Sequence, residues 1–550
     1  MATSSNPPGP DDGQTPQETG SSRRGRPRIR ESLESILPFE RFGDERTILA
    51  GTGQSAVGLV VAILATFGTQ VLITRGLGAE AFGIVTLATQ GALVLGFFSR
   101  FGMDMAAVRR VAIDVGQGER GRVRAVVTRA SVIATVSSVV VAAVVFAFAP
   151  ALARAFAPAF EGATDAFRAG ALAIPFAALV QVYLGATRGL KVMRHTLYVF
   201  WMGQPLGWLV LILGGWLVAR TVGMTTLAYA VSWALATLGA AFLWYRETRG
   251  FGRRPPLVGE VGDLIRYGAP RAPAALFSQL LFWTDLFVLA WFVGSFGVQQ
   301  ADVGVYAAAA RAAQVILLFI ISVSLMFSPF VADLHARGER DKLDRLYKWL
   351  TRWTLAASLP LFIVLAVAPA AALRLFGAEF GAGATALNIL LLGQLVNVAT
   401  GTVGFILIMV GRTGWDLVVY AASVALDVAV ALLLIPGMGM EGAAVAGAVT
   451  MVLSKVARLY LVWRFLRIQP YDRHYLLLLI PTVAAFLAGL VTHLVLEGGP
   501  WQVDLLGTAL AVTVAYVAAL LLAGLPASER RTVTRVFSAV LGRRGTTAEP

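Results

Sequence analysis

The chain has 550 residues, of which 57% are apolar and only 14% are charged, whereas an average soluble domain carries about 25% charged residues. This deficit excludes a soluble enzyme and predicts that most of the surface faces hydrocarbon. The chain has no cysteine, which excludes disulfides and thiolate chemistry, and its four histidines are too scattered for a metal site. The net charge is +14, and the positions of the basic residues along the chain decide how this charge is interpreted.

Residues 1–45 are rich in Pro, Gly and Ser and then strongly basic. They predict a disordered cytoplasmic tail that lacks the apolar core of a secretory signal. A basic run of this kind can mimic a nucleic-acid patch, but its position just before the first apolar stretch favours anionic lipid headgroups. We therefore expect membrane lipids, and no nucleic acid, as partners of this tail.

Fourteen apolar stretches follow, each long enough to cross about 30 Å of hydrocarbon as a helix. They fall at 48–74, 83–107, 127–150, 166–187, 196–219, 222–245, 271–294, 303–330, 352–373, 383–410, 416–436, 441–463, 475–495 and 503–524. The fold class is thus an all-α polytopic membrane protein with about 14 transmembrane helices. Most of the 46 Lys and Arg residues fall in the tails and in alternate loops, which predicts a cell-membrane protein with both termini cytoplasmic.

A shift of about 220 residues aligns two parts of the chain. Arg154 then meets Arg374, and a shift of one residue more places Gly83 on Gly304. The pattern predicts two pseudo-symmetric six-helix lobes in parallel orientation plus two extra C-terminal helices. The expected divisions are a tail (1–45), an N-lobe (46–245), a cytoplasmic linker (246–270), a C-lobe (271–465), spans thirteen and fourteen (466–525) and a cytoplasmic tail (526–550).

Several short motifs carry a resemblance to a known family. They are Thr74–Gly83, Tyr267–Pro270, Asp285 in the following span, Gly304–Arg311 and Leu375–Phe380. The chain resembles polysaccharide and lipid-linked oligosaccharide flippases of the multidrug/oligosaccharidyl-lipid/polysaccharide exporter superfamily. The resemblance implies export of lipid-diphosphate-linked sugars from the inner to the outer leaflet. In the lipid II flippase branch two extra C-terminal helices help to form a groove for the polyprenyl tail, although other branches also carry them.

Ionisable residues inside apolar spans are costly and point to a partner or a wet cavity. Asp285 and Arg311 are expected at similar depth on neighbouring spans, either as a substrate and proton-responsive pair or as a structural bridge. Arg100 and Asp104, four residues apart, are expected to pair along one helix face, and both they and Arg271 either capture a diphosphate or snorkel to the interface.

Three further polar residues complete the expected site. Asp427 has no evident mate in sequence and is a candidate proton or sodium site, or a buried protonated acid. Gln279 and Gln314 could bind sugar hydroxyls, although hydrogen bonds between helices are the commoner use of such amides. We predict substrate-binding residues at Arg100, Asp104, Arg271, Asp285, Arg311, Gln279 and Gln314, ion coupling at Asp285 and Asp427, and no metal site.

The sequence lacks the phosphate-binding loop of ATPases and any large soluble insert, so no enzymatic activity and no cofactor are expected. The leading hypothesis is a flippase for a polyprenyl-diphosphate-linked oligosaccharide or polysaccharide repeat unit, which works as a monomer by alternating access. Membrane potential or exchange of H⁺ or Na⁺ would drive it. The alternatives are a cation-coupled multidrug exporter of the same superfamily, with an acidic and aromatic cavity, and a non-transporting membrane scaffold with a filled core.

Overall fold

The computed structural model describes residues 45–252, 259–317, 319–320, 331, 334–335 and 337–524. Within these ranges the chain forms helices and no strand, which confirms the predicted all-α membrane fold. The predicted tails, 1–45 and 526–550, lie outside the described residues except for Glu45, as does part of the predicted span 303–330.

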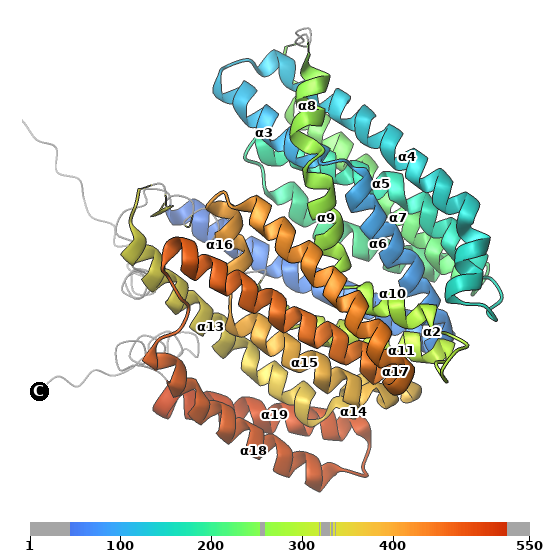
Figure 1. Cartoon of the computed structure of the whole chain (residues 1–550), viewed down its shortest axis with the longest axis vertical. Helices are drawn as coiled ribbons and strands as arrows, with labels where there is room; N and C mark the ends of the chain where they lie inside the picture. Colours follow the sequence, from blue (N-terminus) through green and yellow to red (C-terminus); the bar gives the residue numbers. More distant parts are fainter. Residues whose placement is uncertain are drawn as a thin grey trace, which may run out of the picture. The chain divides into compact units, whose positions relative to one another are not determined.

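The helices before residue 250 belong to the predicted N-lobe. They are α2 (Glu45–Ser99), α3 (Met103–Gly116), η1 (Arg120–Arg122), α4 (Val123–Phe156), α5 (Ala163–Gly189), η2 (Thr196–Gly203), α6 (Gln204–Gly215) and α7 (Val222–Glu247). Helix α5 lies at the centre of this group, because it packs against α2, α3, α4 and α7. Figure 1 shows α3 to α7 grouped in the upper part of the view.

The remaining helices begin in the predicted linker. They are α8 (Glu260–Gly268), α9 (Arg271–Leu280), α10 (Thr284–Trp291), α11 (Gln300–Gln314), α13 (Arg340–Val367), α14 (Pro369–Leu373), η3 (Ala378–Gly383), α15 (Ala384–Ala399), α16 (Val403–Met409), α17 (Thr413–Leu466), η4 (Arg473–Leu478), α18 (Leu479–Leu496), α19 (Trp501–Ala519) and η5 (Leu520–Gly524). Helices α18 and α19 pair with each other and pack against α13.

Two very long helices are broken by glycine. Helix α2 has 55 residues and would be about 80 Å long if straight, but Gly78 (φ 84°, ψ 177°) interrupts it. Helix α17 has 54 residues and is interrupted at Gly439 (φ 58°, ψ −129°). Both positive φ values lie where glycine is favoured, and both breaks fall between two predicted spans.

Ten helices in the described part of the chain are long and apolar enough to cross a membrane, or eleven if one bent pair is a single span. This count treats α17 as one helix and the part of α2 from Val61 to Ser99 as another. The number of fourteen crossings therefore stays a prediction.

Two predicted continuous spans are wrong in detail, because the backbone breaks inside them. The predicted span 83–107 is interrupted between α2 and α3, where Phe101 (φ 55°) and Gly102 (φ 69°) are left-handed. The predicted span 271–294 is interrupted between α9 and α10, and the helical segments on either side of that break differ in direction by 66°. Both breaks lie beside predicted site residues.

Candidate functional site

The break between α9 and α10 sets the position of Asp285. Because the helix restarts at Thr284, Asp285 lies in the first turn of α10. The amino end of a helix carries a partial positive charge that stabilises an acidic side chain. Discontinuous membrane helices often place such ends at substrate or ion sites, so the break gives Asp285 a chemical setting that a continuous helix would not.

The Asp285 carboxylate is buried and held by neighbouring groups. It accepts a hydrogen bond from the hydroxyl of Tyr306 on α11 at 2.6 Å, and another from the backbone N–H of Leu286 at 2.7 Å. It also lies against Gly447 on α17, where an added Cβ would come within 2.3 Å of Oδ2. Three helices therefore meet at this carboxylate.

Asp427 is the second acid of this cluster. It lies on α17, is fully buried, interacts electrostatically with Asp285 and lies beside Thr450. Neither of its carboxylate oxygens has a hydrogen-bond partner among the described groups. No partner for Asp427 is evident in the sequence, and the fold places another acid beside it rather than a base.

Asp285 and Asp427 form no ion pair with a basic side chain in the described ranges. Two adjacent buried carboxylates repel each other, and an unpaired buried charge is strongly unfavourable. A shared proton or a bound cation relieves that cost. Carboxylate and hydroxyl oxygens suit a hard cation such as Na⁺, so Asp285, Asp427 and Thr450 are the residues that could hold one.

A small cavity of about 30 Å³ opens beside Asp285. Gln314 and Gln394 add amide groups to its wall, and the other lining residues are apolar. A larger cavity of about 340 Å³ lies among α2, α4, α5, α9 and α10, with an apolar lining that includes Phe287. Arg100, Arg271, Arg311 and Gln279 line neither cavity, so of the predicted sugar-binding amides only Gln314 does.

The expected pairing of Asp285 with Arg311 is wrong. The Arg311 guanidinium lies over the ring of Trp283, 4.4 Å from its centroid, while Asp285 binds Tyr306 instead. Tyr306 and Arg311 are five residues apart on α11 and so point about 140° apart around the helix axis. The predicted pairing rested only on the similar depth of the two charges in the membrane. The break before α10 and the angle between Tyr306 and Arg311 on α11 give the two charges different partners.

The expected pair of Arg100 and Asp104 forms, but not on one continuous helix. Arg100 Nε lies 3.3 Å from Asp104 Oδ1 across the break between α2 and α3, and both residues are buried. Arg188 on α5 interacts electrostatically with the same carboxylate. Burial argues against the snorkelling interpretation of Arg100, because a snorkelling side chain keeps its charge in water.

Arg458, near the inner end of the last predicted span of the C-lobe, forms a buried ion pair and does not extend to the membrane interface. Its side chain is 2% exposed, donates from Nε to Asp416 Oδ1 at 2.8 Å and contacts Ser454. Asp416 carried no signal in the sequence because it lies at the edge of an apolar stretch.

The two loop motifs that carried the family resemblance contact each other. The backbone N–H of Ala79 donates to Glu379 Oε1 at 2.8 Å, and Arg75 Nε donates to the Leu375 carbonyl at 3.0 Å. Between the same parts of the chain, an added Cβ on Gly83 would lie 2.9 Å from the backbone nitrogen of Gly304.

The contact between Gly83 and Gly304 bears on the internal repeat. The predicted alignment makes these two glycines equivalent, and equivalent positions can touch only where they meet at a symmetry axis. Such a contact is what a two-fold axis between the predicted lobes would require, and the division into lobes stays a prediction. The role of Glu379 here was missed, because an acid in an outer loop gives no signal in hydropathy.

Comparisons with known proteins define the class. The structure is similar to "Lipid II flippase MurJ, inward closed conformation", with a TM-score of 0.66, 13% identity, and coverage of 89% of this chain and 100% of that one. It is also similar to an inward-facing multidrug resistance MATE family transporter of the MOP superfamily, with a TM-score of 0.62, 13% identity, and coverage of 75% and 98%. A MOP superfamily transporter from Pyrococcus furiosus matches with a TM-score of 0.55, 14% identity, and coverage of 76% and 95%. The fold is thus that of the multidrug/oligosaccharidyl-lipid/polysaccharide exporters.

The sequence places the chain within this class. A family model described as "Polysaccharide biosynthesis protein" matches residues 48–335, more than half of the chain, and the chain belongs to that family. The MatE model matches residues 274–433, which include both acids of the cluster. No curated protein sequence matches the chain. It is a multi-pass membrane protein of a superfamily of transporters and flippases, not of enzymes.

Proposed function

We propose that the protein moves a polyprenyl-diphosphate-linked oligosaccharide or polysaccharide repeat unit from the inner to the outer leaflet by alternating access. The observation that carries the proposal is membership of the polysaccharide biosynthesis family. The predicted lobes, 46–245 and 271–465, rock against each other while both termini stay in the cytoplasm, and the protein works as a monomer. The polyprenyl tail stays in lipid throughout.

The basic residues of the predicted site serve the diphosphate. Arg100, Arg271 and Arg311 neutralise it, since arginine is suited to forked contacts with phosphate oxygens. Asp104 orients Arg100, and Gln279 and Gln314 contact sugar hydroxyls. Transfer of negative charge out of a negative cytoplasm is favoured by about 2.3 kcal/mol per charge per 100 mV, so the membrane potential assists the step.

The acid cluster supplies the ion coupling. Asp285 and Asp427 are buried together without a basic partner in the described part of the chain, so an entering H⁺ or Na⁺ has a site there. Binding of a cation draws α10 and α17 together at Asp285, and release lets them separate. Such a difference between two states is what allows an ion gradient to bias a conformational equilibrium.

Transport in proteoliposomes tests this function. The purified protein is reconstituted with a fluorescent polyprenyl-diphosphate-linked sugar, and movement between leaflets is followed with and without H⁺ or Na⁺ gradients. We expect gradient-dependent transport that Asp427→Asn uncouples, with Glu80→Gln, an exposed acid outside the cluster, as the control. Absence of wild-type transport under any gradient or potential would contradict the proposal.

A second candidate function is cation-coupled export of drugs. The MatE match spans both Asp285 and Asp427, and the small cavity beside Asp285 is lined by an acid and an aromatic residue, Phe282. This function predicts gradient-driven movement of a cationic dye in the same proteoliposomes, with no movement of the lipid-linked sugar.

A further inference from the structure

Helix α8, in the predicted linker, is packed against the break between α2 and α3. An added Cβ on Gly102 would lie 2.2 Å from the carbonyl oxygen of Gly268, and one on Gly268 would lie 2.7 Å from the carbonyl oxygen of Phe101. Backbone therefore touches backbone at this point. Tyr267 and Arg271, on either side of Gly268, are held in a fixed position relative to α3.

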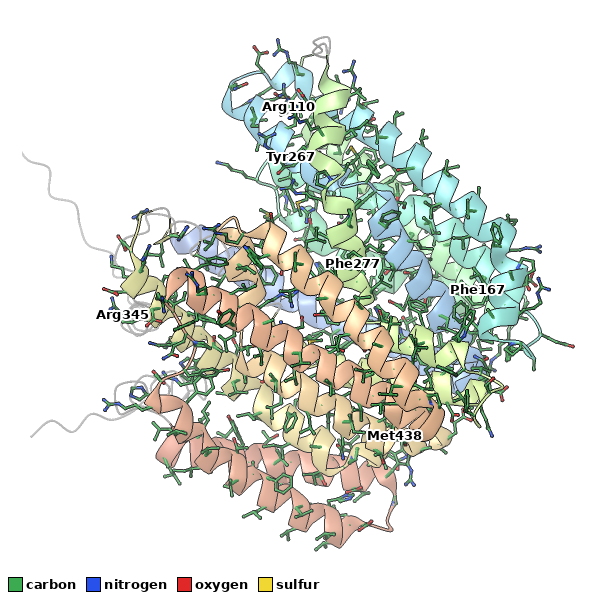
Figure 2. The ribbon with its side chains drawn as sticks, viewed as in Figure 1. Arg110, Phe167, Tyr267, Phe277, Arg345 and Met438 are labelled. Atoms are coloured by element: carbon green, nitrogen blue, oxygen red, sulfur yellow. The ribbon has the colours of Figure 1, made fainter. Side chains whose placement is uncertain are left out.

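Two arginines share the ring of Tyr267. The guanidinium carbon of Arg271 lies 4.0 Å from the ring centroid and that of Arg109, on α3, lies 4.7 Å from it. The two carbons are therefore at most 8.7 Å apart. Arg271 also donates from a guanidinium N–H to the Tyr267 carbonyl at 3.1 Å. Figure 2 shows Tyr267 at the same end of the helices as Arg110, the neighbour of Arg109.

Neither of these arginines is neutralised by the protein in the described ranges. Arg110 pairs with Asp114 at 3.2 Å and Arg100 pairs with Asp104 at 3.3 Å, whereas among the side chains that the structure describes no carboxylate lies within ion-pair distance of Arg109 or Arg271. Arg109 is exposed, and Arg271 is partly so. The ring thus holds two uncompensated positive charges that remain accessible.

The arrangement is electrostatically unfavourable without an anion. Two like charges close together repel each other, and this repulsion is offset when an anion binds between or beside them. Contacts with an aromatic ring orient a guanidinium but leave its outer N–H groups free for phosphate oxygens. An anion with two charged groups would offset this repulsion.

We propose that Arg109 and Arg271, held on Tyr267, form a diphosphate clamp that receives the headgroup of the lipid-linked substrate at the predicted cytoplasmic end. The clamp rests on the proposed function, because it assigns the entry site of the same substrate. Each guanidinium takes one of the two linked phosphates, so a diphosphate binds both arginines whereas a single phosphate binds one. The same chemistry could recognise an anionic phospholipid, which the experiment distinguishes.

Ligand binding to the purified full chain tests the clamp. Calorimetric titration uses three probes: a polyprenyl diphosphate, a polyprenyl monophosphate and phosphatidylglycerol. We expect Arg109→Gln and Arg271→Gln each to weaken diphosphate binding about 10- to 100-fold, the range for loss of a charge-assisted contact. The matched control is Arg266→Gln, which removes one exposed charge next to Tyr267 outside the clamp and is expected to change binding less than about twofold.

The ring itself is tested by two substitutions. Tyr267→Phe keeps the aromatic face and is expected to bind the diphosphate as the wild type does, whereas Tyr267→Leu removes the face that orients both arginines and weakens binding. Helical content and thermal unfolding verify that each variant is folded. Binding that survives both arginine substitutions would overturn the clamp, and so would an equal loss in Arg266→Gln.

The probes and a transport assay separate this inference from the proposed function. Phosphatidylglycerol binding as tight as diphosphate binding would overturn the clamp in favour of a lipid-surface site. If the variants show the expected binding pattern but the wild type moves no lipid-linked sugar, the clamp stands and the function fails. If the wild type transports and the Arg109 and Arg271 variants bind and transport equally well, the function stands and the clamp fails.

Discussion

Replacement of Gly304 by alanine tests the backbone contact between the two predicted lobes. An added Cβ would lie 1.8 Å from the carbonyl oxygen of Ala79 and 2.6 Å from its carbonyl carbon. Non-bonded heavy atoms settle at about 3.5 Å or more, so α11 and the segment around Ala79 must move apart by roughly 1.5 to 2 Å. Both clashing atoms belong to the backbone, which cannot rotate away as a side chain can.

The separation would disturb the neighbouring contacts. Ala79 also donates to Glu379, and Arg75 donates to the Leu375 carbonyl, so these bonds lengthen together. Overpacking typically costs about 1–3 kcal/mol. If the contact belongs to only one conformation of the transport cycle, that cost lowers the population of this conformation, relative to the one in which the contact is broken, by roughly 5- to 150-fold.

Paired spin labels measure this shift. The chain has no cysteine, so Glu80→Cys and Ala378→Cys, both at exposed positions, give a clean label pair across the contact. We expect Gly304→Ala to move the measured distances to larger values. Gly68→Ala on α2, where an added Cβ meets nothing within 4 Å, is the control. An unchanged distance distribution together with an unchanged melting temperature would refute the reasoning.

Three further predictions concern buried charges. The double exchange Asp285→Arg with Arg311→Asp is expected to leave transport abolished, because the two side chains have different partners; restored transport would show that they act as a pair. Gly447→Ala places a Cβ 2.3 Å from the Asp285 carboxylate and should weaken cation dependence at least tenfold, so an unaltered dependence in the transport assay would count against the acid cluster. Arg458→Gln leaves Asp416 buried without its partner and is expected to destabilise the protein by about 3–5 kcal/mol, measured by unfolding in detergent; a wild-type melting temperature would rule this out.

Hydropathy predicted the fold class because lipid leaves the backbone few options. An apolar run cannot satisfy its amides in hydrocarbon except as a helix, so the position of most helices followed from composition. The breaks at Gly78 and Gly439 lie where the predicted spans are separated. The breaks near Gly102 and Trp283 were not predicted, because a local change of φ leaves the hydropathy of the segment unaltered.

The candidate site was predictable residue by residue but not as an arrangement. Asp285 and Asp427 stood out because an acid in an apolar run is costly, yet nothing in the sequence indicates that they are neighbours. Tyr306 gave no signal, since a tyrosine is unremarkable in a membrane helix, and it nevertheless takes the place that was expected for Arg311. The partner of Asp285 depends on the break between α9 and α10, which the hydropathy of the segment does not indicate.

Deletion in the native cell tests the central claim most directly, namely that the protein exports a lipid-linked glycan. Lipid-linked sugars are extracted after deletion and assayed for their leaflet by their accessibility to a membrane-impermeant glycan-modifying enzyme. The account predicts that one polyprenyl-diphosphate-linked species accumulates on the inner leaflet and that re-expression of the wild-type chain reverses this. Unchanged amounts on both leaflets, with no accumulating intermediate, would contradict it.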